Sequence, residues 1–542
     1  MFRLALSRVE RPLRSGRFWV AIAFACLLYS ALTARVALID DALPYCRHVD
    51  ERTWTKRATV ILQTSDLNPH RFNKPSMMVY LNTFGLALGL VRAGSHGDPA
   101  HAPAALSSKQ DFPYYSSPTA IATLRYLYAL LSVATMALAA ACVRRMTAND
   151  LAALVSLPLM MSSAFYLNYS WHYLNVDLLG CFFAFSAIYY AISRGSTSDP
   201  RLEACICGLL GGLTLGTKYN LFWIAVPLLL RIVSSSPRRW PGLTMLFFVC
   251  MGATFVLTTP YAVLDVEAFT QAAAGEAFHY ATGHKQQVWE SGVPMLLKYL
   301  SGVPGNFGWP LSLCALVGLI HALWKTGIRG WILVSYPLLL LLYMSKQHVF
   351  FERNLLILQL MTPLLAAIGM HALWPGLRSR ISARFPQLSL AQARSCAFGV
   401  FALGCALGAP WSKTADAYAL GQESRNVASQ WILENVPAET RLVIPEELQF
   451  SPHLLGDRYE LIFFEGKSTS WQALPDEYPG GLLFLPEFEE ERPVRWTREL
   501  NSVRGLRVRK SFGQKPLTFK VKREKRIVAP VFGDPRFSLV EL

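Results

Sequence analysis

The feature that most constrains this chain is a series of apolar runs, each near the length of about twenty residues that a helix needs to cross the hydrocarbon of a membrane. The first run covers residues 18–39 and follows an N-terminal stretch with five arginines. Ten more lie at 119–142, 150–168, 174–193, 202–217, 219–234, 241–260, 305–324, 331–345, 354–374 and 391–411. The pattern predicts an α-helical polytopic membrane protein with about eleven transmembrane helices.

Composition and the placement of charge favour the same class. Of the 542 residues, 52% are hydrophobic and only 16% are charged. The net charge of +16 does not indicate nucleic-acid binding, because the Lys and Arg residues fall mostly in short loops between apolar runs. Those loops mark the cytoplasmic side, so the N-terminus is expected in the cytoplasm behind an uncleaved first span. An odd number of spans then places the C-terminal segment outside.

The chain divides into a membrane module at 1–411 and a C-terminal extracytoplasmic domain at 412–542. The second part is polar and has a helical stretch at 423–435, followed by short strand-like runs at 441–444, 461–464 and 481–485, which predict a small α/β or α+β domain. Within the first part, 40–117 forms a long extracytoplasmic loop and 261–303 a second one. Segment 77–91 is open to being a re-entrant or interfacial helix, and the short runs beside Lys218 to being one broken unit.

An acidic stretch stands where the chain leaves its first span. Asp40 and Asp41 precede the sequence Cys-Arg-His-Val-Asp-Glu-Arg at 46–52. Such charges are costly at a membrane edge unless they are solvated or used, so we take the stretch as the candidate chemical centre. A solvated loop is the alternative. Asp50 and Glu51 also suit the start of a helix predicted over 49–62, where carboxylates favour the helix dipole.

Other charged residues occupy the loops expected on the same side. Lys74 lies among proline-marked turns at 68–76, Asp177 opens an apolar run, Lys218 sits in a turn, and Arg353 lies at a membrane edge. Basic groups that gather at one leaflet suit a lipid phosphate. Two simpler roles remain open: Asp177 as a helix cap and Lys218 as a snorkelling interfacial residue.

Several of these motifs together resemble a known family. They are His-Val-Asp-Glu at 48–51, Lys-Pro-Ser at 74–76, Asp177, Gly-Thr-Lys-Tyr-Asn at 216–220, and the stretches 259–269, 283–284 and 353–363. Over residues 15–410 the chain resembles GT-C membrane glycosyltransferases of the bacterial family 39 type, which are relatives of protein O-mannosyltransferases and aminoarabinose transferases. Ser76 stands where the family has proline, and 92–117 is an insertion.

The resemblance implies transfer of a sugar, with inversion, from a polyprenyl-phosphate donor to a glycan, lipid or protein acceptor at the outer face of a bacterial inner membrane. It makes Asp50 the general base, with Glu51 and Asp177 holding the base or the acceptor. It places four cationic residues at the donor phosphate: Arg47, Lys74, Lys218 and Arg353. Four further residues are assigned assisting roles: His48, His172, Asp41 and His284.

Three points stay open beside the resemblance. No cofactor is firmly implied, although a divalent metal ion held by Asp50 and Asp177 is an alternative, because oligosaccharyl-transferring cousins use one. The family places a loop like 265–298 over the site as a lid, whereas the amphipathic sequence equally suits a helix lying on the bilayer. A transporter or flippase, or a non-catalytic scaffold with the same fold, would also have many spans, but internal repeats are not visible here. The expected partners are therefore the lipid donor, an acceptor and the bilayer, without nucleic acid.

Overall fold

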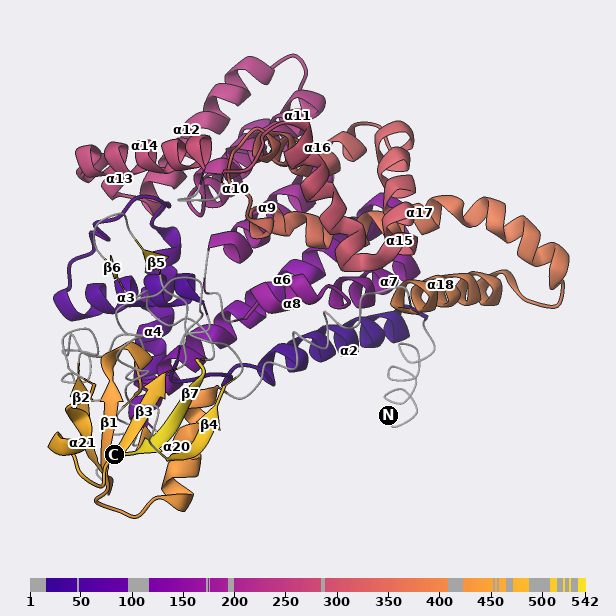
Figure 1. The fold of residues 1–542 in the computed structure, drawn as a ribbon. Coiled ribbons are helices and arrows are strands. Elements are labelled where there is room, and N and C mark those ends of the chain that lie inside the picture. The colour runs from indigo at the N-terminus through magenta and orange to yellow at the C-terminus, as the bar shows by residue number, and fades with distance from the viewer. Residues whose placement is uncertain are drawn as a thin grey trace, which may run out of the picture. The chain divides into compact units, whose positions relative to one another are not determined.

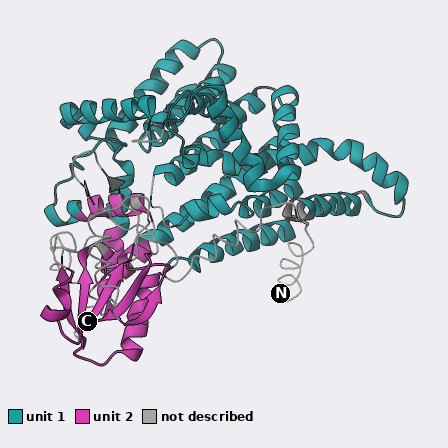
Figure 2. Ribbon diagram, in the orientation of Figure 1, with its two compact units in different colours: residues 1–39, 60–85, 124–419 teal, residues 40–59, 86–123, 420–542 magenta. Residues whose placement is uncertain are grey.

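The fold was analysed in a computed structural model, which describes residues 16–45, 48–95, 117–171, 174, 176–193, 199–283, 288–407, 423–451, 454–455, 458–464, 471–486, 507–513, 520–521, 526–527 and 535–542. The chain forms two compact units, coloured separately in Figure 2. Unit 1 comprises residues 1–39, 60–85 and 124–419, and unit 2 comprises 40–59, 86–123 and 420–542. The segment from residue 420 onward therefore shares a unit with parts of the first long loop.

Long helices dominate the part of the chain before 412, as the apolar runs predict (Figure 1). Seven described helices are long and apolar enough to cross a membrane: Phe18–Val36, Met77–Gly94, Pro118–Thr147, Trp240–Thr258, Val293–Lys325, Ile328–Ser345 and Glu352–Arg384. Three shorter apolar helices accompany them: Asp150–Met161, Val176–Ile192 and Tyr219–Ser235. The prediction of a helical polytopic membrane protein with a small C-terminal domain is confirmed.

The helices before the outer loop of 261–303 are α2 (Gly16–Val36), α3 (Val49–Thr64), α4 (Met77–Ser95), α6 (Pro118–Thr147), α7 (Asp150–Met161), α8 (Ala164–Tyr169), α9 (Val176–Ile192), α10 (Pro200–Leu215), η2 (Tyr219–Ile224), α11 (Ala225–Ser235) and α12 (Trp240–Thr258). The run at 150–168 is thus two helices, because Ser163 caps the start of α8 with its side chain. Segment 77–91 belongs to one continuous helix, α4.

The later helices of unit 1 are α13 (Tyr261–Leu264), α14 (Val266–Thr282), α15 (Val293–Lys325), α16 (Ile328–Ser345), η3 (Glu352–Leu355), α17 (Leu356–Arg384) and α18 (Leu390–Leu407). Helices α15, α16 and α17 pack together, and α17 continues out of this bundle before the chain returns as α18 (Figure 1). Most of α17 up to Met370 is buried, so it forms a central element of the unit.

Close packing of α10 against α12 sets the position of the turn at Lys218. Gly208, Gly212 and Gly216 recur every fourth residue, and a Cβ added at Gly212 would lie 2.5 Å from the Cβ of Thr254 on α12. Small residues at this spacing let two membrane helices approach closely. Lys218 then adopts an extended backbone between α10 and η2. The two short runs beside it are therefore a helix and a second helix that begins as a 3-10 turn.

The C-terminal part of unit 2 is a small α/β domain built on a five-stranded sheet. Helix α20 (Ser424–Asn435) precedes a sheet of strand order β2-β1-β3-β7-β4, in which β1 runs parallel to β2 and β3 while β7 is antiparallel to β3 and β4. The elements are β1 (Arg441–Pro445), η4 (Glu446–Leu448), β2 (Glu460–Phe464), α21 (Leu474–Glu477), β3 (Leu482–Pro486), β4 (Val508–Phe512), β5 (Lys520–Val521), β6 (Arg526–Ile527) and β7 (Phe537–Glu541). Strands β5 and β6 pair separately.

Alternation along the strands gives this sheet two apolar faces. Leu442 and Ile444 of β1 pack in a cluster with Ile432 of α20, whereas Val443 packs in another cluster with Trp471. Successive side chains of a strand point to opposite faces, so both faces of the sheet are covered. The predicted strands at 441–444, 461–464 and 481–485 and the helix at 423–435 correspond to elements of the structure.

Candidate functional site

The acidic stretch belongs to unit 2, and Asp50 occupies the first turn of α3 there. The Asp50 backbone N–H donates to Nδ1 of His48 at 3.0 Å, so the His48 ring caps the start of the helix. The Asp50 carboxylate is 23% exposed and lies 3.8 Å from the same ring nitrogen. Glu51 is fully buried. Of the two adjacent carboxylates, only that of Asp50 is accessible to a substrate.

Several other expected site residues lie outside that motif. Asp41 is half-buried in the turn that follows the first span. Arg47, His172 and His284 fall outside the residues that the structure describes. Their proposed roles at the phosphate or beside the base remain predictions.

A second group of predicted residues meets inside unit 1. Lys218 Nζ lies 2.7 Å from Oδ1 of Asp177, at the start of α9, and also 2.7 Å from Oδ1 of Asn354 on η3. All three residues are buried. Burial alone would lower the pKa of Lys218, but the Asp177 carboxylate outweighs it and the pKa is raised above its usual value. Lys218 therefore remains an ammonium group, and its charge is matched by Asp177.

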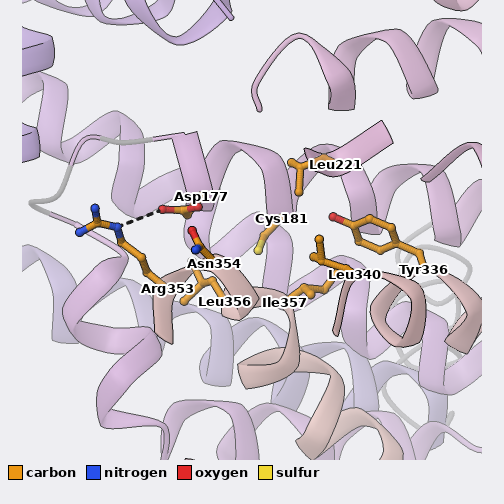
Figure 3. Close-up of a pocket in the computed structure, with 9 residues that line it drawn as sticks. All are labelled: Asp177, Cys181, Leu221, Tyr336, Leu340, Arg353, Asn354, Leu356 and Ile357. Carbon is orange, nitrogen blue, oxygen red and sulfur yellow. Dashed lines mark ion pairs between the residues drawn. The ribbon is translucent and has the colours of Figure 1, made fainter. Parts of the chain in front are cut away.

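Arg353 adds a second cation to this pair. Its Nε lies 3.8 Å from Oδ2 of Asp177, and its side chain is 20% exposed, whereas those of Asp177 and Lys218 are almost completely covered. Figure 3 shows the guanidinium directed toward the Asp177 carboxylate. The guanidinium also lies 4.8 Å from the centre of the Phe351 ring. Arg353 is thus the cation of this group that a ligand can reach.

A small cavity of about 10 Å³, with room for about one water molecule, lies against these residues. Asp177, Arg353 and Asn354 form its polar side (Figure 3). The remaining lining residues are Cys181, Leu221, Tyr336, Leu340, Leu356 and Ile357. The cavity is too small for a phosphate group, so a ligand group can reach these residues only at the exposed part of Arg353.

The segment 261–303 contributes two residues, Glu276 and Tyr280, to which the sequence assigned no role in the site. Lys74 forms an ion pair with Glu276 of α14, and its Nζ lies 5.5 Å from the centre of the Tyr280 ring. The Tyr280 hydroxyl lies 3.2 Å from Oδ1 of Asn354, to which it donates. Glu276 and Tyr280 are four residues apart and share one helical face, which is the signal that could have linked them. Tyr280 therefore connects Lys74 to the Lys218 group.

Further contacts fix the proline-marked segment that carries Lys74. The Asn68 amide donates to Oδ2 of Asp265 at 2.9 Å, and the Tyr219 hydroxyl donates to the carbonyl of Phe72 at 2.7 Å. The Phe72 ring also meets that of Phe269 edge to face. These contacts join residues 68–74 to α14 and to the Gly-Thr-Lys-Tyr-Asn turn, although these segments are far apart in the sequence.

The group carries three cations and two carboxylates. The cations are Lys74, Lys218 and Arg353, and the carboxylates are Asp177 and Glu276. The described ion pairs among them are Lys74–Glu276, Lys218–Asp177 and Arg353–Asp177. Among the described residues, no three His, Cys, Asp or Glu side chains gather as a metal site.

Comparison with solved structures identifies the fold. The structure is similar to the crystal structure of ArnT from Cupriavidus metallidurans bound to undecaprenyl phosphate, with a TM-score of 0.54, 13% identity, and coverage of 97% of this chain and 98% of that one. The apo form of the same protein matches with a TM-score of 0.52, at 13% identity and the same coverage. The chain has the GT-C fold, as the resemblance predicted.

An archaeal oligosaccharyltransferase from Archaeoglobus fulgidus matches more weakly, with a TM-score of 0.47, 12% identity, and coverage of 87% of this chain and 70% of that one. No protein-family model matches the chain, and no curated protein matches it by sequence.

Proposed function

We propose that this integral membrane protein is an inverting glycosyltransferase that moves a sugar from a polyprenyl-phosphate donor to an acceptor at the extracytoplasmic face. The observation that carries the proposal is the cationic group of Lys74, Lys218 and Arg353 inside the GT-C fold. Such a group suits the phosphate of a lipid donor. ArnT, whose fold covers nearly the whole chain, has been crystallised with undecaprenyl phosphate, a ligand of the same class.

The structure refines the roles that we assign to the cations. Arg353 reaches a partly open surface, and its planar guanidinium can hold two phosphate oxygens at once, so we assign it to the donor phosphate. Lys74 is assigned there with it, because its Glu276 partner belongs to α14, in a loop that the family uses as a lid. Lys218 is hydrogen-bonded to Asp177 and Asn354, so we assign it to orient those two groups and to supply positive charge without contacting the phosphate.

Asp50 is the general base in this proposal. As the acceptor oxygen or nitrogen bonds to the anomeric carbon, its proton passes to the Asp50 carboxylate. The bond from that carbon to the phosphate oxygen breaks at the same time, and polyprenyl phosphate leaves with the electron pair. By taking the proton, the base removes the positive charge that develops on the acceptor, while Arg353 and Lys74 stabilise the negative charge that develops on the phosphate.

Two further features belong to the proposal. Asp177 lies between Lys218 and Arg353, so we place no divalent ion there and expect no metal requirement from this residue. We place the N-terminus in the cytoplasm of a bacterium and the C-terminal domain in the periplasm, in agreement with the basic loops of the sequence. The acceptor is a glycan, a lipid or a protein.

The test compares lipid extracts and glycoconjugates by mass spectrometry in cells that have the intact protein, lack it, or carry Asp50→Asn. Glu460→Gln is the control, because Glu460 is an exposed carboxylate of β2 that pairs with Arg441 and has no part in the proposed site. We expect a polyprenyl-phosphate sugar to accumulate, and one glycoconjugate to lose that sugar, in the deletion and Asp50→Asn strains only.

Normal glycoconjugates in an Asp50→Asn strain with wild-type protein levels would refute the assigned base. Unchanged lipids and glycans in the deletion strain would refute the transferase itself and favour a transport or scaffold role.

A further inference from the structure

The segment that leads into the acidic motif is bound to the C-terminal domain within unit 2. The side-chain amide of Asn426 on α20 donates to the carbonyl of Leu43 at 2.9 Å. The backbone N–H of Ser451 donates to the Tyr45 hydroxyl at 2.9 Å. The guanidinium of Arg425 lies 3.7 Å from the centre of the Tyr45 ring. Three contacts from a domain nearly four hundred residues later in the sequence therefore hold residues 43–45.

Arg425 is the centre of this contact. Its side chain is 1% exposed, as is that of its ion-pair partner Glu423, whose Oε1 lies 2.7 Å from Arg425 Nε. Nη1 of Arg425 also donates to the carbonyls of Leu448 and Gln449, at 3.2 and 3.4 Å. The end of η4 and the start of α20 are thus bound to the same guanidinium that stacks on Tyr45.

Only an arginine has the shape that this arrangement needs. A guanidinium donates in its plane to a carboxylate and to carbonyls, while its face stacks on an aromatic ring. A lysine at 425 could keep the charge, but its ammonium group has no flat face to lie on Tyr45. Tyr45 is itself 1% exposed, so the stacked pair lies in the interior of unit 2.

This contact restricts where the acidic motif can lie. Asp50 follows Tyr45 by five residues, and a fully extended chain of that length spans at most about 18 Å. Helix α3 starts at Val49, four residues after Tyr45, so the position of Tyr45 limits where the first turn of the helix can lie. Release of Tyr45 would free the start of α3 from the C-terminal domain.

We propose that Arg425 is a positioning residue, through which the C-terminal domain holds the segment at 40–52 so that Asp50 is placed for catalysis. This role rests on the proposed function. A misplacement of about 1 Å at reacting groups can cost a factor of roughly a hundred in rate. A contact that fixes the segment carrying Asp50 should therefore affect the rate.

The test uses the full-length protein in lipid nanodiscs and two independent variants. Arg425→Met combined with Glu423→Gln removes the guanidinium without leaving a buried carboxylate unpaired, and Tyr45→Leu removes the ring from the other side. Tyr45→Phe keeps the ring and serves as the conservative variant. Arg441→Met is the matched control, because it breaks the exposed Arg441–Glu460 ion pair in the same sheet.

Hydrogen exchange and steady-state transfer are measured on each protein. We expect exchange in the peptide covering 40–52 to rise at least about tenfold in the double variant and in Tyr45→Leu, while β1, β3 and β7 keep their protection. We expect kcat to fall about tenfold or more with the donor KM within about twofold of wild type. Arg441→Met should behave like the wild type in both measurements. Tyr45→Phe keeps the stacked ring but loses the acceptor of the Ser451 N–H, so it should change both measurements less than Tyr45→Leu does.

Unchanged exchange at 40–52 in the double variant and in Tyr45→Leu would overturn the inference. Exchange that rises equally in the sheet strands would also overturn it, because Arg425 would then serve general stability. If exchange at 40–52 rises but kcat stays at the wild-type value, the positioning role is refuted and the proposed function stands. If the wild-type protein itself transfers no sugar, the proposed function is refuted.

Discussion

The buried pair of Lys218 and Asp177 gives the sharpest quantitative prediction. Each partner is less than one-tenth exposed, and the two atoms lie 2.7 Å apart. Removal of Asp177 takes the carboxylate from buried Lys218, and removal of Lys218 leaves Asp177 with the more distant Arg353 at 3.8 Å. Breaking a buried pair in this way typically costs about 3–5 kcal/mol of the free energy of unfolding. Lys218→Met and Asp177→Leu should each have a cost of this size.

The double variant should cost much less than the sum of the two. With both charges gone, two groups lose a contact: Arg353, which is 20% exposed, loses Asp177, and Asn354 loses the bond from Lys218 to its Oδ1 but keeps the one from Tyr280. A weakened buried hydrogen bond of this kind costs about 1–3 kcal/mol. The double-mutant cycle formed by these variants therefore predicts a coupling free energy of roughly 3 kcal/mol or more between Lys218 and Asp177.

The free energies are measured by SDS titration in mixed micelles, with tryptophan fluorescence reporting unfolding. The Arg144–Asp150 pair is the control, because its atoms are as close, at 2.5 Å, but its side chains are 64% and 34% exposed. An exposed pair should show a coupling below about 1 kcal/mol. Additive costs for Lys218→Met and Asp177→Leu, with a coupling as small as that of the control, would refute the reasoning from burial.

Three further predictions concern Asp50, the two cations assigned to the donor phosphate, and the pKa of Lys218. Asp50→Asn should lower the transfer rate of purified protein about 100- to 10,000-fold; a rate within a few-fold of wild type would remove the base. Lys74→Met and Arg353→Lys should each raise the donor KM about tenfold or more in steady-state assays, because a charge-assisted contact to phosphate is lost; an unchanged KM would contradict the assignment. The pKa of Lys218 is raised above its usual 10.5, so stability from its pair is present below that pH and is lost only as the pH rises through the folded-state value. The coupling free energy should accordingly stay constant between about pH 6 and 9, and a decline within that window in SDS titrations at several pH values would contradict it.

The membrane class of the protein and its small C-terminal domain were predictable from sequence alone. An apolar run long enough to cross a bilayer is a local property, and so is the alternation in a strand such as β1. The turn at 216–220 and the helix starting near Asp50 were also found at the expected places. Each of these depends on neighbours in the chain, which the sequence lists directly.

The partners of the charged residues could not be predicted from the sequence. Lys218 and Arg353 were both singled out as phosphate-binding candidates, but nothing in their local sequence shows that Lys218 is buried against Asp177 while Arg353 stays partly exposed. Tyr280 was not singled out, because its partner Asn354 is 74 residues away along the chain. Burial and pairing decide the charge state and the accessibility of such groups, and both arise from long-range packing.

The sequence by itself determined that this chain is a membrane protein with acidic and basic residues between its apolar runs, because hydrophobic length and charge are properties of short segments. Tertiary structure alone decided which of those charges neutralise each other, and it alone joined Tyr45 to Arg425. The physical reason is that a buried ion pair or a stacked guanidinium gains its energy only when segments far apart in the chain close around it and exclude water.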